Sequence, residues 1–268
     1  YTGFLLTLLR RFKRQERVKR IDSLTKLSET LTRTASSSKR SELNLREKNV
    51  GSTILQCIAW VMMKGTEPKD KKDVKKWCCE SFSEEELETE VPKLKLSVLE
   101  AHVRRLCGDL DTIETQLIPK GIQITPCPGI CTLDLSSNGL HMEGVADAYR
   151  AALMFATLRR NEYCVAVNMS SNPLLGPVSG IAFGSFLKNN KNLHTLNLSQ
   201  VNLGDEGIRM LVQCGLKQNR ALRHLNLDAN EITCHGMRDV ADALRKCKLH
   251  ELRIACNKVG PKGLHTLS

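Results

Sequence analysis

The stretch that decides the fold is Leu193-His194-Thr195-Leu196-Asn197-Leu198-Ser199-Gln200-Val201-Asn202-Leu203-Gly204. Its leucines follow the spacing L-x-x-L-x-L, which places alternate side chains of a short strand on one buried face and the residues between them on the other. The segment after it, residues 205–218, carries apolar residues at the three-to-four spacing of a helix. We therefore predict a unit made of a strand, a turn and a helix.

The same pattern recurs on both sides of this stretch. Related strands begin at Ile130, Cys164, Leu193, Leu222 and Leu249, so the steps are 34, 29, 29 and 27 residues. An asparagine that can satisfy backbone groups of the turn stands three residues after the last apolar strand position at Asn138, Asn172, Asn230 and Asn257, and Val201 takes this place in the remaining unit. One unit cannot bury its apolar edge alone, so the units must stack. The longer first step implies about five extra residues near 159–163.

These five registered units resemble the leucine-rich repeat family. A period of 27–29 residues with a helix in each unit is similar to the ribonuclease-inhibitor-like class of that family. The resemblance covers residues 129–268 and implies an α/β solenoid, with a curved parallel sheet inside and helices outside. It also implies a non-catalytic role in binding other proteins.

A sixth copy of the pattern stands alone upstream, where residues 43–51 align with residues 196–204. Leu45 and Leu135 are 90 residues apart, about three repeat lengths, so either two degenerate units or an insertion lies between them. The charged segment 67–90 lacks the repeat pattern. It is followed by a heptad seam formed by Leu96, Leu99, Val103, Leu106, Leu110, Ile113 and Leu117. The seam favours an insertion, and it packs either on the repeats or on another protein.

We therefore expect four parts. Residues 1–40 form a basic amphipathic helix and a polar linker, and residues 41–66 form an isolated or first repeat. Residues 67–128 form a charged insertion with a heptad helix at 95–118, and residues 129–268 form the main stack of repeats. Because the chain starts at Tyr1 and stops within the repeating pattern, we expect it to be part of a longer protein.

The net charge of +11 is concentrated near the start of the chain. Residues 1–50 hold 13 basic and 5 acidic groups. Residues 4–31 carry apolar side chains at helical spacing, which predicts a basic amphipathic helix. Its basic residues are Arg10, Arg11, Lys13, Arg14, Arg17, Lys19 and Arg20. We interpret it as a docking helix for a partner. A membrane-surface helix, a mitochondrial presequence and a helix that packs on its own chain are the alternatives.

The surface expected to bind partners is the concave face, which consists of the strand residues that point away from the helices and the polar residues just after them. Its candidate residues are Asp134, Ser136, Asn168, Ser170, Asn197, Ser199, His224, Asn226, Asp228, Glu251 and Arg253. This set is polar and contains no aromatic residue, whereas binding hot spots are usually rich in Trp, Tyr and Arg. A purely solvated face is the alternative interpretation.

No motif in the sequence predicts a catalytic, cofactor or metal site. The chain lacks a phosphate-binding loop, a dinucleotide fingerprint, an H-E-x-x-H motif and a C-x-x-C motif. Most of the eleven cysteines occupy apolar repeat positions, which is typical of packing residues in a reducing compartment. No apolar run reaches the length of a transmembrane helix, about 18 residues. We expect an intracellular protein of the cytoplasm or cytoskeleton, with the cilium as one setting and the mitochondrion as an alternative.

The function predicted from these features is that of a scaffold that binds other proteins within a multi-subunit assembly, either cytoskeletal or ciliary. One alternative is an RNA-associated or organellar ribonucleoprotein subunit that contacts nucleic acid through the basic helix. Another is a GTPase-activating regulator similar to the Ran-type repeat proteins, with Arg46 as the candidate arginine. The residues around Arg46 do not reproduce a motif of that family.

Overall fold

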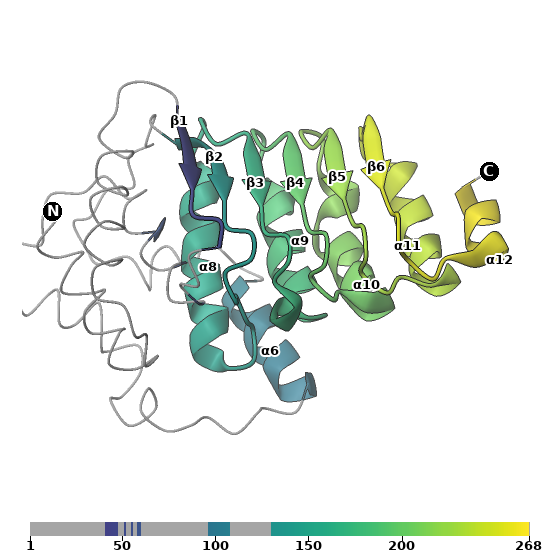
Figure 1. Ribbon diagram of the computed structural model, residues 1–268, viewed down its shortest axis with the longest axis horizontal. Coiled ribbons are helices and arrows are strands. Elements are labelled where there is room, and N and C mark those ends of the chain that lie inside the picture. The colour runs from purple at the N-terminus through teal and green to yellow at the C-terminus, as the bar shows by residue number, and fades with distance from the viewer. Residues whose placement is uncertain are drawn as a thin grey trace, which may run out of the picture.

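The computed structural model describes residues 41–47, 51, 55, 58–59, 96–107 and 130–267. Six short parallel strands form one sheet, in which their order follows the chain (Figure 1). They are β1 (Ser41–Asn44), β2 (Ile130–Asp134), β3 (Ala166–Asn168), β4 (Thr195–Asn197), β5 (His224–Asn226) and β6 (Glu251–Arg253). β1 pairs directly with β2, with Leu43 opposite Leu133. This pairing supports an insertion, rather than further repeats, between the first two strands.

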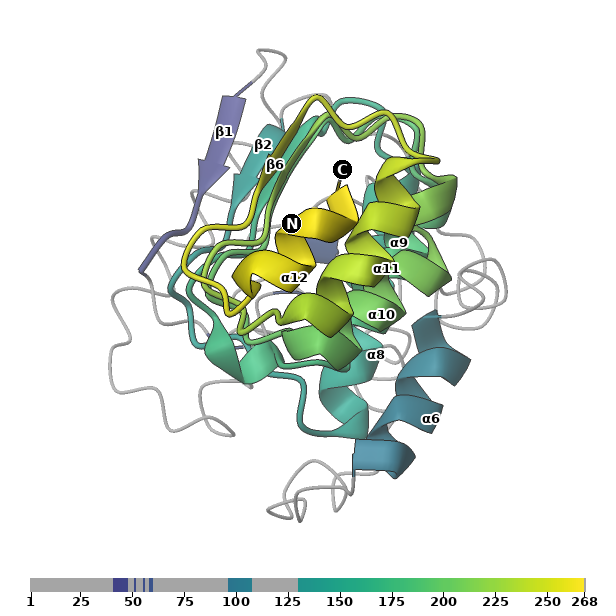
Figure 2. The ribbon, with the colours of Figure 1, turned by 90° about the vertical axis from the view of Figure 1, so that its right-hand side faces the viewer.

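The helices that follow the strands lie together on one face of the sheet (Figure 2). They are α8 (Val145–Arg160), α9 (Ser179–Asn189), α10 (Gly204–Cys214), α11 (Cys234–Leu244) and α12 (Gly260–Leu264), with short 3-10 turns at Pro173–Leu175, Leu216–Gln218 and His265–Leu267. α8 has 16 residues whereas α9, α10 and α11 have 11 each, so the extra residues of the longer step lengthen a helix. The predicted α/β solenoid is confirmed.

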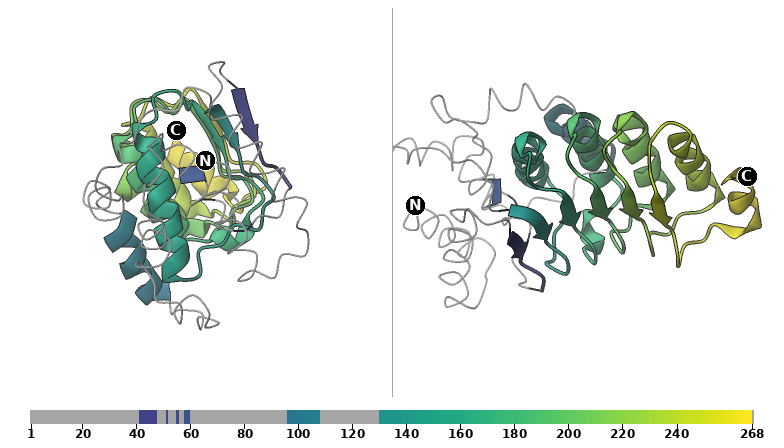
Figure 3. Two further views of the ribbon diagram at one scale, coloured as in Figure 1. Left: turned by 90° about the vertical axis from the view of Figure 1, so that its left-hand side faces the viewer. Right: turned by 90° about the horizontal axis from the view of Figure 1, so that it is seen from above.

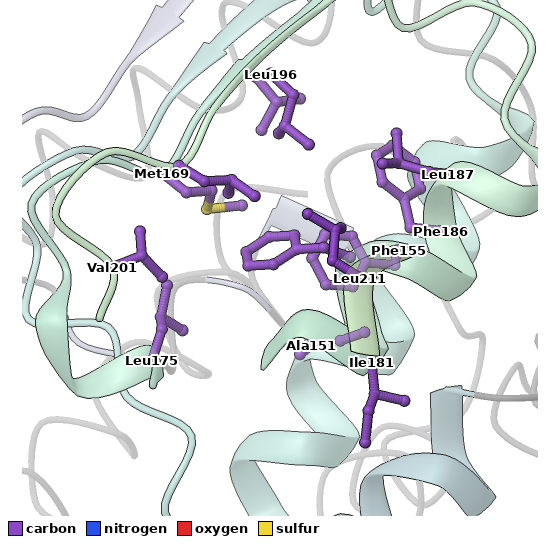
Figure 4. Close-up of a cluster of buried hydrophobic side chains, with 14 of the residues drawn as sticks. Ala151, Phe155, Met169, Leu175, Ile181, Phe186, Leu187, Leu196, Val201 and Leu211 are labelled. Atoms are coloured by element: carbon purple, nitrogen blue, oxygen red, sulfur yellow. The ribbon is translucent and has the colours of Figure 1, made fainter. Parts of the chain in front are cut away.

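The hydrophobic core fills the space between the sheet and the helices. Alternate strand residues such as Val167, Leu196 and Leu225 are at most 2% exposed, as the L-x-x-L-x-L spacing requires. In Figure 4, the rings of Phe155 and Phe186 lie within this layer, and their centroids are 5.2 Å apart in a stacked arrangement. Burying such a side chain contributes roughly 1.5–3 kcal/mol of transfer free energy, so the stack is held mainly by this layer.

Buried asparagines connect the turns of successive repeats. The Asn172 amide nitrogen donates to the carbonyls of Met169 at 2.8 Å and Leu135 at 3.0 Å. Its side-chain oxygen accepts from the backbone N–H groups of Asn138 and Leu140, both at 3.0 Å. Asn230 and Asn257 make equivalent bonds. Each asparagine thus satisfies backbone groups of its own turn and of the preceding repeat, which is the function that the sequence predicts.

The turn that carries Val201 keeps the conformation of its neighbours. Gln200 and Asn202 have φ values of 56° and 61°, and the corresponding Ala229 and Glu231 have 53° and 60°. Val201 itself is fully buried. The departure from asparagine therefore changes the hydrogen bonding of this turn but not its path.

Asp205 caps a helix other than its own. It lies in the first turn of α10, where a negative charge suits the positive end of the helix dipole. Its carboxylate also accepts hydrogen bonds from Thr233 N at 2.8 Å, Thr233 Oγ1 at 2.6 Å and Gly236 N at 3.0 Å, at the start of α11. The orphan N–H groups of a helix N-terminus need such acceptors. The same carboxylate also links the two repeats.

Glycines allow α9 and α10 to approach each other closely. A Cβ atom added to Gly180 would overlap the backbone oxygen of Gly207, and one added to Gly184 would lie 2.8 Å from the carbonyl oxygen of Leu211. Real Cβ atoms do not approach backbone atoms so closely, so these positions accept only glycine unless the helices move apart.

The inserted segment contributes a helix, α6 (Leu96–Cys107), which lies outside the main helix layer against α8 and α9 (Figure 3). Leu99, Val103 and Cys107 on its inner side are at most 5% exposed. This part of the heptad seam therefore packs within the chain. Residues 108–129, which include most of the rest of the predicted helix, lie outside the described residues, as does the whole segment 67–95.

Two buried cysteines behave as apolar packing residues. Burial raises the pKa of the Cys107 and Cys164 thiols to about 12. Both thiols are therefore uncharged near neutral pH, and neither is a reactive thiolate.

Asp147 is a buried carboxylate near the start of α8. It contacts His141 at 3.0 Å and Arg150 at 3.1 Å, and it accepts from the backbone N–H of Gly144 at 3.2 Å. Burial on its own raises the pKa of Asp147, but the hydrogen bond with His141 and the charges of His141 and Arg150 outweigh it, so the pKa lies below the ordinary 3.8. The ionised carboxylate consequently stabilises the folded state above that pH.

We expect Asp147→Asn to lower the free energy of unfolding by about 2 kcal/mol at pH 7, because charge-assisted hydrogen bonds are lost. The folded-state pKa is the depressed one, so the stabilisation is present above the ordinary pKa of 3.8 and disappears as the pH falls through the folded value. Urea denaturation of both proteins from pH 7 to pH 3 measures this difference. Asp239→Asn is the control, because burial raises the pKa of Asp239 and its loss should not destabilise at pH 7. A constant difference across the pH range would contradict the assignment.

Candidate protein-binding surface

The register of the sheet aligns the candidate residues of the concave face into rows. Asp134 pairs in turn with Asn168, Asn197, Asn226 and Arg253 across β2 to β6. A second row runs from Thr132 through Ala166, Thr195 and His224 to Glu251. The helices lie on one face of the sheet (Figure 2), and these residues alternate along the strands with the buried Val167, Leu196 and Leu225, which places them on the opposite face. The structure thus brings the candidate residues of the strands onto one surface, and their binding of a partner stays a prediction.

The central row also has a structural function that the sequence did not reveal. The side-chain oxygens of Asp134, Asn168, Asn197 and Asn226 each accept a hydrogen bond from the backbone N–H two residues later, at 2.8–3.1 Å. Asn and Asp favour such bonds, which fix the turn after the strand. These residues therefore shape the rim of the concave face as well as lining it.

Candidate residues differ in exposure along the sheet. Ser136 and Ser170 are buried, at 4% and 8% exposed, so they offer little surface to a partner. Toward β6 the polar side chains are exposed, in particular His224, Glu251 and Arg253. The predicted basic docking helix and its seven basic residues lie outside the described residues.

Side chains on and just after β5 contact side chains of β6. His224 Nδ1 lies 3.2 Å from Glu251 Oε2, and Arg253 Nε lies 3.1 Å from Asp228 Oδ2. An open hollow of about 250 Å³ lies beside them over β4, β5 and β6. Its polar lining consists of Thr195, Asn197, His224, Asn226, Glu251 and Arg253. The geometry suits hydrogen-bonded and ionic contact with a partner.

Sequence reasoning overlooked a second charged surface, at the loops that lead into β4, β5 and β6. We call it the basic ridge, and it consists of Lys188, Lys191, Lys217, Arg220, Arg223, Arg245, Lys246 and Lys248. The signal was available, because residues 188–194, 215–223 and 244–250 contain no Asp or Glu. The net charge of the whole repeat region hides this local excess of positive charge, because acidic residues elsewhere in the repeats offset it.

The part of the chain that the structure describes holds neither a metal-binding cluster nor a membrane-spanning helix. Within it, no three His, Cys, Asp or Glu side chains are grouped so as to hold a metal ion. None of the helices described there is long and apolar enough to cross a membrane.

A family model for the leucine-rich repeat matches residues 189–212 and 245–268, which include β4 and β6 with the turns that follow them. This chain contains leucine-rich repeats. The matched residues include the quoted stretch and the last repeat, and the same strand, turn and helix recur in the units between and before them. The ribonuclease-inhibitor-like class remains an interpretation of the repeat length.

One curated relative shares part of this leucine-rich repeat chain. It is the protein of Mus musculus named NACHT, LRR and PYD domains-containing protein 4B, which is 37% identical over 82 residues. The match covers 30% of the present chain and 10% of the mouse protein. Leucine-rich repeats indicate a role in protein–protein interaction, because their stacked units present an extended surface to a partner.

Proposed function

We propose that this leucine-rich repeat protein is a non-catalytic scaffold that binds another protein through the concave face over β4 to β6. The observation that carries the proposal is the hollow of about 250 Å³ beside the exposed His224, Glu251 and Arg253. Strands in parallel register hold the backbone of these residues at fixed positions. The loss of conformational entropy on binding a partner is therefore small.

The composition of this face favours specific rather than very tight binding. The hollow is lined by Leu196, Leu225 and six polar residues, and its lining contains no Phe, Tyr or Trp. Since aromatic anchors supply much of the affinity at most interfaces, recognition here rests on charge and hydrogen bonds. Arg253 is central, because its guanidinium is 3.1 Å from Asp228 and faces the hollow with Glu251.

A finer proposal concerns the setting of the scaffold. We propose a subunit of a larger intracellular assembly, cytoskeletal or ciliary, in which the repeats form a rigid arc and neighbouring subunits dock on it. The support is the combination of a repeat stack with an additional helix, α6, packed on its outer side. Arg46 forms an ion pair with Glu47 at 3.0 Å, which gives the GTPase-regulator alternative no specific support.

We expect Arg253→Glu to reduce binding of concave-face partners by about tenfold or more, since it places a third carboxylate beside Asp228 and Glu251. The measurement is affinity capture from cell extract, followed by quantitative mass spectrometry of the captured proteins. Arg238→Glu is the matched control, because Arg238 is an exposed arginine on α11, in the helix layer.

The proposal predicts a set of proteins that is lost with Arg253→Glu and retained with Arg238→Glu. Circular dichroism must first show that both variants keep the fold. An equal loss with both variants, or no loss with Arg253→Glu, would place the docking surface elsewhere.

A further inference from the structure

The basic ridge is a continuous row of positive charge along one edge of the solenoid. The backbone N–H of Arg223 donates to the carbonyl of His194 at 2.8 Å, and that of His250 donates to the carbonyl of Arg223 at 2.7 Å. The loops before β4, β5 and β6 are therefore in register, and neighbouring loops lie about one strand spacing apart, roughly 4.8 Å. Lys188 and Lys217 occupy equivalent positions in two successive repeats, as do Lys191 and Arg220, so each pair is brought side by side. Arg245, Lys246 and Lys248 lie in the next loop at other positions of the repeat.

Among the residues that the structure describes, carboxylates neutralise little of this charge. Lys246 forms an ion pair with Asp242 at 3.3 Å. Across residues 41–47, 96–107 and 130–267, no ion pair joins a carboxylate to any of the other seven ridge residues. Like charges held close together repel one another and destabilise the compact state. The ridge therefore costs stability in the free protein.

Two arginines of the ridge are held in place by backbone carbonyls. The Arg223 guanidinium donates to the carbonyls of Arg220 at 2.9 Å and Lys248 at 3.2 Å. Arg220 donates to the carbonyl of Lys217 at 3.1 Å. These bonds fix the positions of the cations but leave them charged, so the ridge is arranged in advance for an anionic ligand.

Favourable interaction with helix dipoles explains only part of the ridge. Basic groups stabilise the last turn of a helix, and this effect disappears beyond it. Lys188 lies in the last turn of α9, whereas Lys191, Arg220 and Lys248 come after their helices and close to the next strand. The charges nearest the strands need another explanation.

We propose that the basic ridge binds an acidic segment of a partner protein. Residues 188–194, 215–223 and 244–250 contain no Phe, Tyr or Trp, so the ridge lacks the stacking platforms that single-stranded nucleic acid uses. An extended peptide of about three to four residues spans the three loops, given a rise of roughly 3.4 Å per residue. The ridge shares no residue with the lining of the hollow, so substitutions can test the two proposals independently.

The test measures binding of a fluorescent hexaglutamate peptide, and of a 12-nucleotide single-stranded RNA, to the full chain by fluorescence anisotropy. The ridge variant is Lys191→Gln, Lys217→Gln and Lys248→Gln combined, which leaves the carbonyl bonds of Arg220 and Arg223 intact. We expect it to weaken peptide binding by about tenfold or more in 50 mM NaCl, and we expect binding by the unmodified chain to weaken as salt is raised. Its melting temperature should stay the same or rise.

The control is a second triple variant that removes the same charge away from the ridge: Arg238→Gln, Lys258→Gln and Lys262→Gln. It should change peptide affinity by less than about twofold, and so should Arg253→Glu if the ridge is the site. Equal losses in the two triple variants would show a net-charge effect and overturn the proposal. Tighter binding of RNA than of peptide through the ridge would overturn it as well.

Carbodiimide coupling locates the bound peptide directly, since it joins a carboxylate to a lysine amine in contact with it. We expect mass spectrometry to find the peptide on Lys191, Lys217 and Lys248. Coupling mainly to Lys13 and Lys19, in the basic segment near the start of the chain, would overturn the proposal.

Discussion

Replacing Asn230 by alanine should lower the free energy of unfolding by about 3–4 kcal/mol, because the side chain is fully buried and serves four backbone groups. Its amide nitrogen donates to the carbonyls of Leu198 at 2.7 Å and Asp228 at 3.1 Å. Its oxygen accepts from the N–H groups of Val201 at 3.2 Å and Leu203 at 3.1 Å. Truncation removes these partners at a site from which water is excluded, and the backbone groups of two repeats lose their hydrogen bonds together.

Urea denaturation followed by circular dichroism measures this loss, with Asn189→Ala as the matched control. Asn189 is an exposed residue at the end of α9, and its replacement should change the stability by less than about 0.5 kcal/mol. Loss of the Asn230 hydrogen bonds should also separate the unfolding of the last repeats from that of the others, since each repeat is coupled only to its neighbours. Similar stability of the two variants would show that the buried asparagine is not essential to the stack.

Replacing Gly180 by alanine should destabilise the protein by about 2–3 kcal/mol, although alanine is the better helix former by about 1 kcal/mol. The added Cβ would overlap the backbone oxygen of Gly207 on α10 and would lie 3.0 Å from its carbonyl carbon. Backbone atoms cannot rotate away as a flexible side chain can. The two helices must therefore separate, and the core layer beneath them loses contacts.

Gly144→Ala is the comparison for this second prediction. Gly144 has an extended backbone with φ of −137°, and its added Cβ would come no closer than 3.9 Å to Asp147. We expect a change of less than about 1 kcal/mol there, measured by thermal and urea unfolding. A stabilised Gly180→Ala protein would mean that helix propensity outweighs the contact and that α9 and α10 have room to move.

Much of the fold could be predicted because it depends on local patterns. The spacing of leucines set the strands, and the pairing of Leu43 with Leu133 follows from the same pattern at the first repeat. The rows of the concave face followed from the period alone, since aligned residues of successive repeats meet in a parallel sheet. The buried asparagines had a function that could be derived from the unsatisfied groups of a turn.

Features that depend on contacts between repeats could not be predicted in the same way. Asp205 begins α10, and nothing in its own repeat indicates that its hydrogen-bond partners Thr233 and Gly236 lie one repeat later. The side-chain oxygen of Asn197 bonds to Ser199 N, a local use that competes with its availability to a ligand. The position of α6 against α8 and α9 could not be predicted, because a heptad pattern does not identify the surface on which it packs.

The direct pairing of β1 with β2 has a consequence for how the chain reaches its folded state. Leu43 and Leu133 are 90 residues apart, whereas neighbouring strands of the later repeats, such as those of Val167 and Leu196, are separated by 29. Closing the longer loop costs only about 1 kcal/mol more in chain entropy, yet distant pairings form slowly. The repeats from β2 onward can nucleate and propagate between neighbours, so the first strand joins a sheet that already exists and is the last part of it to be ordered.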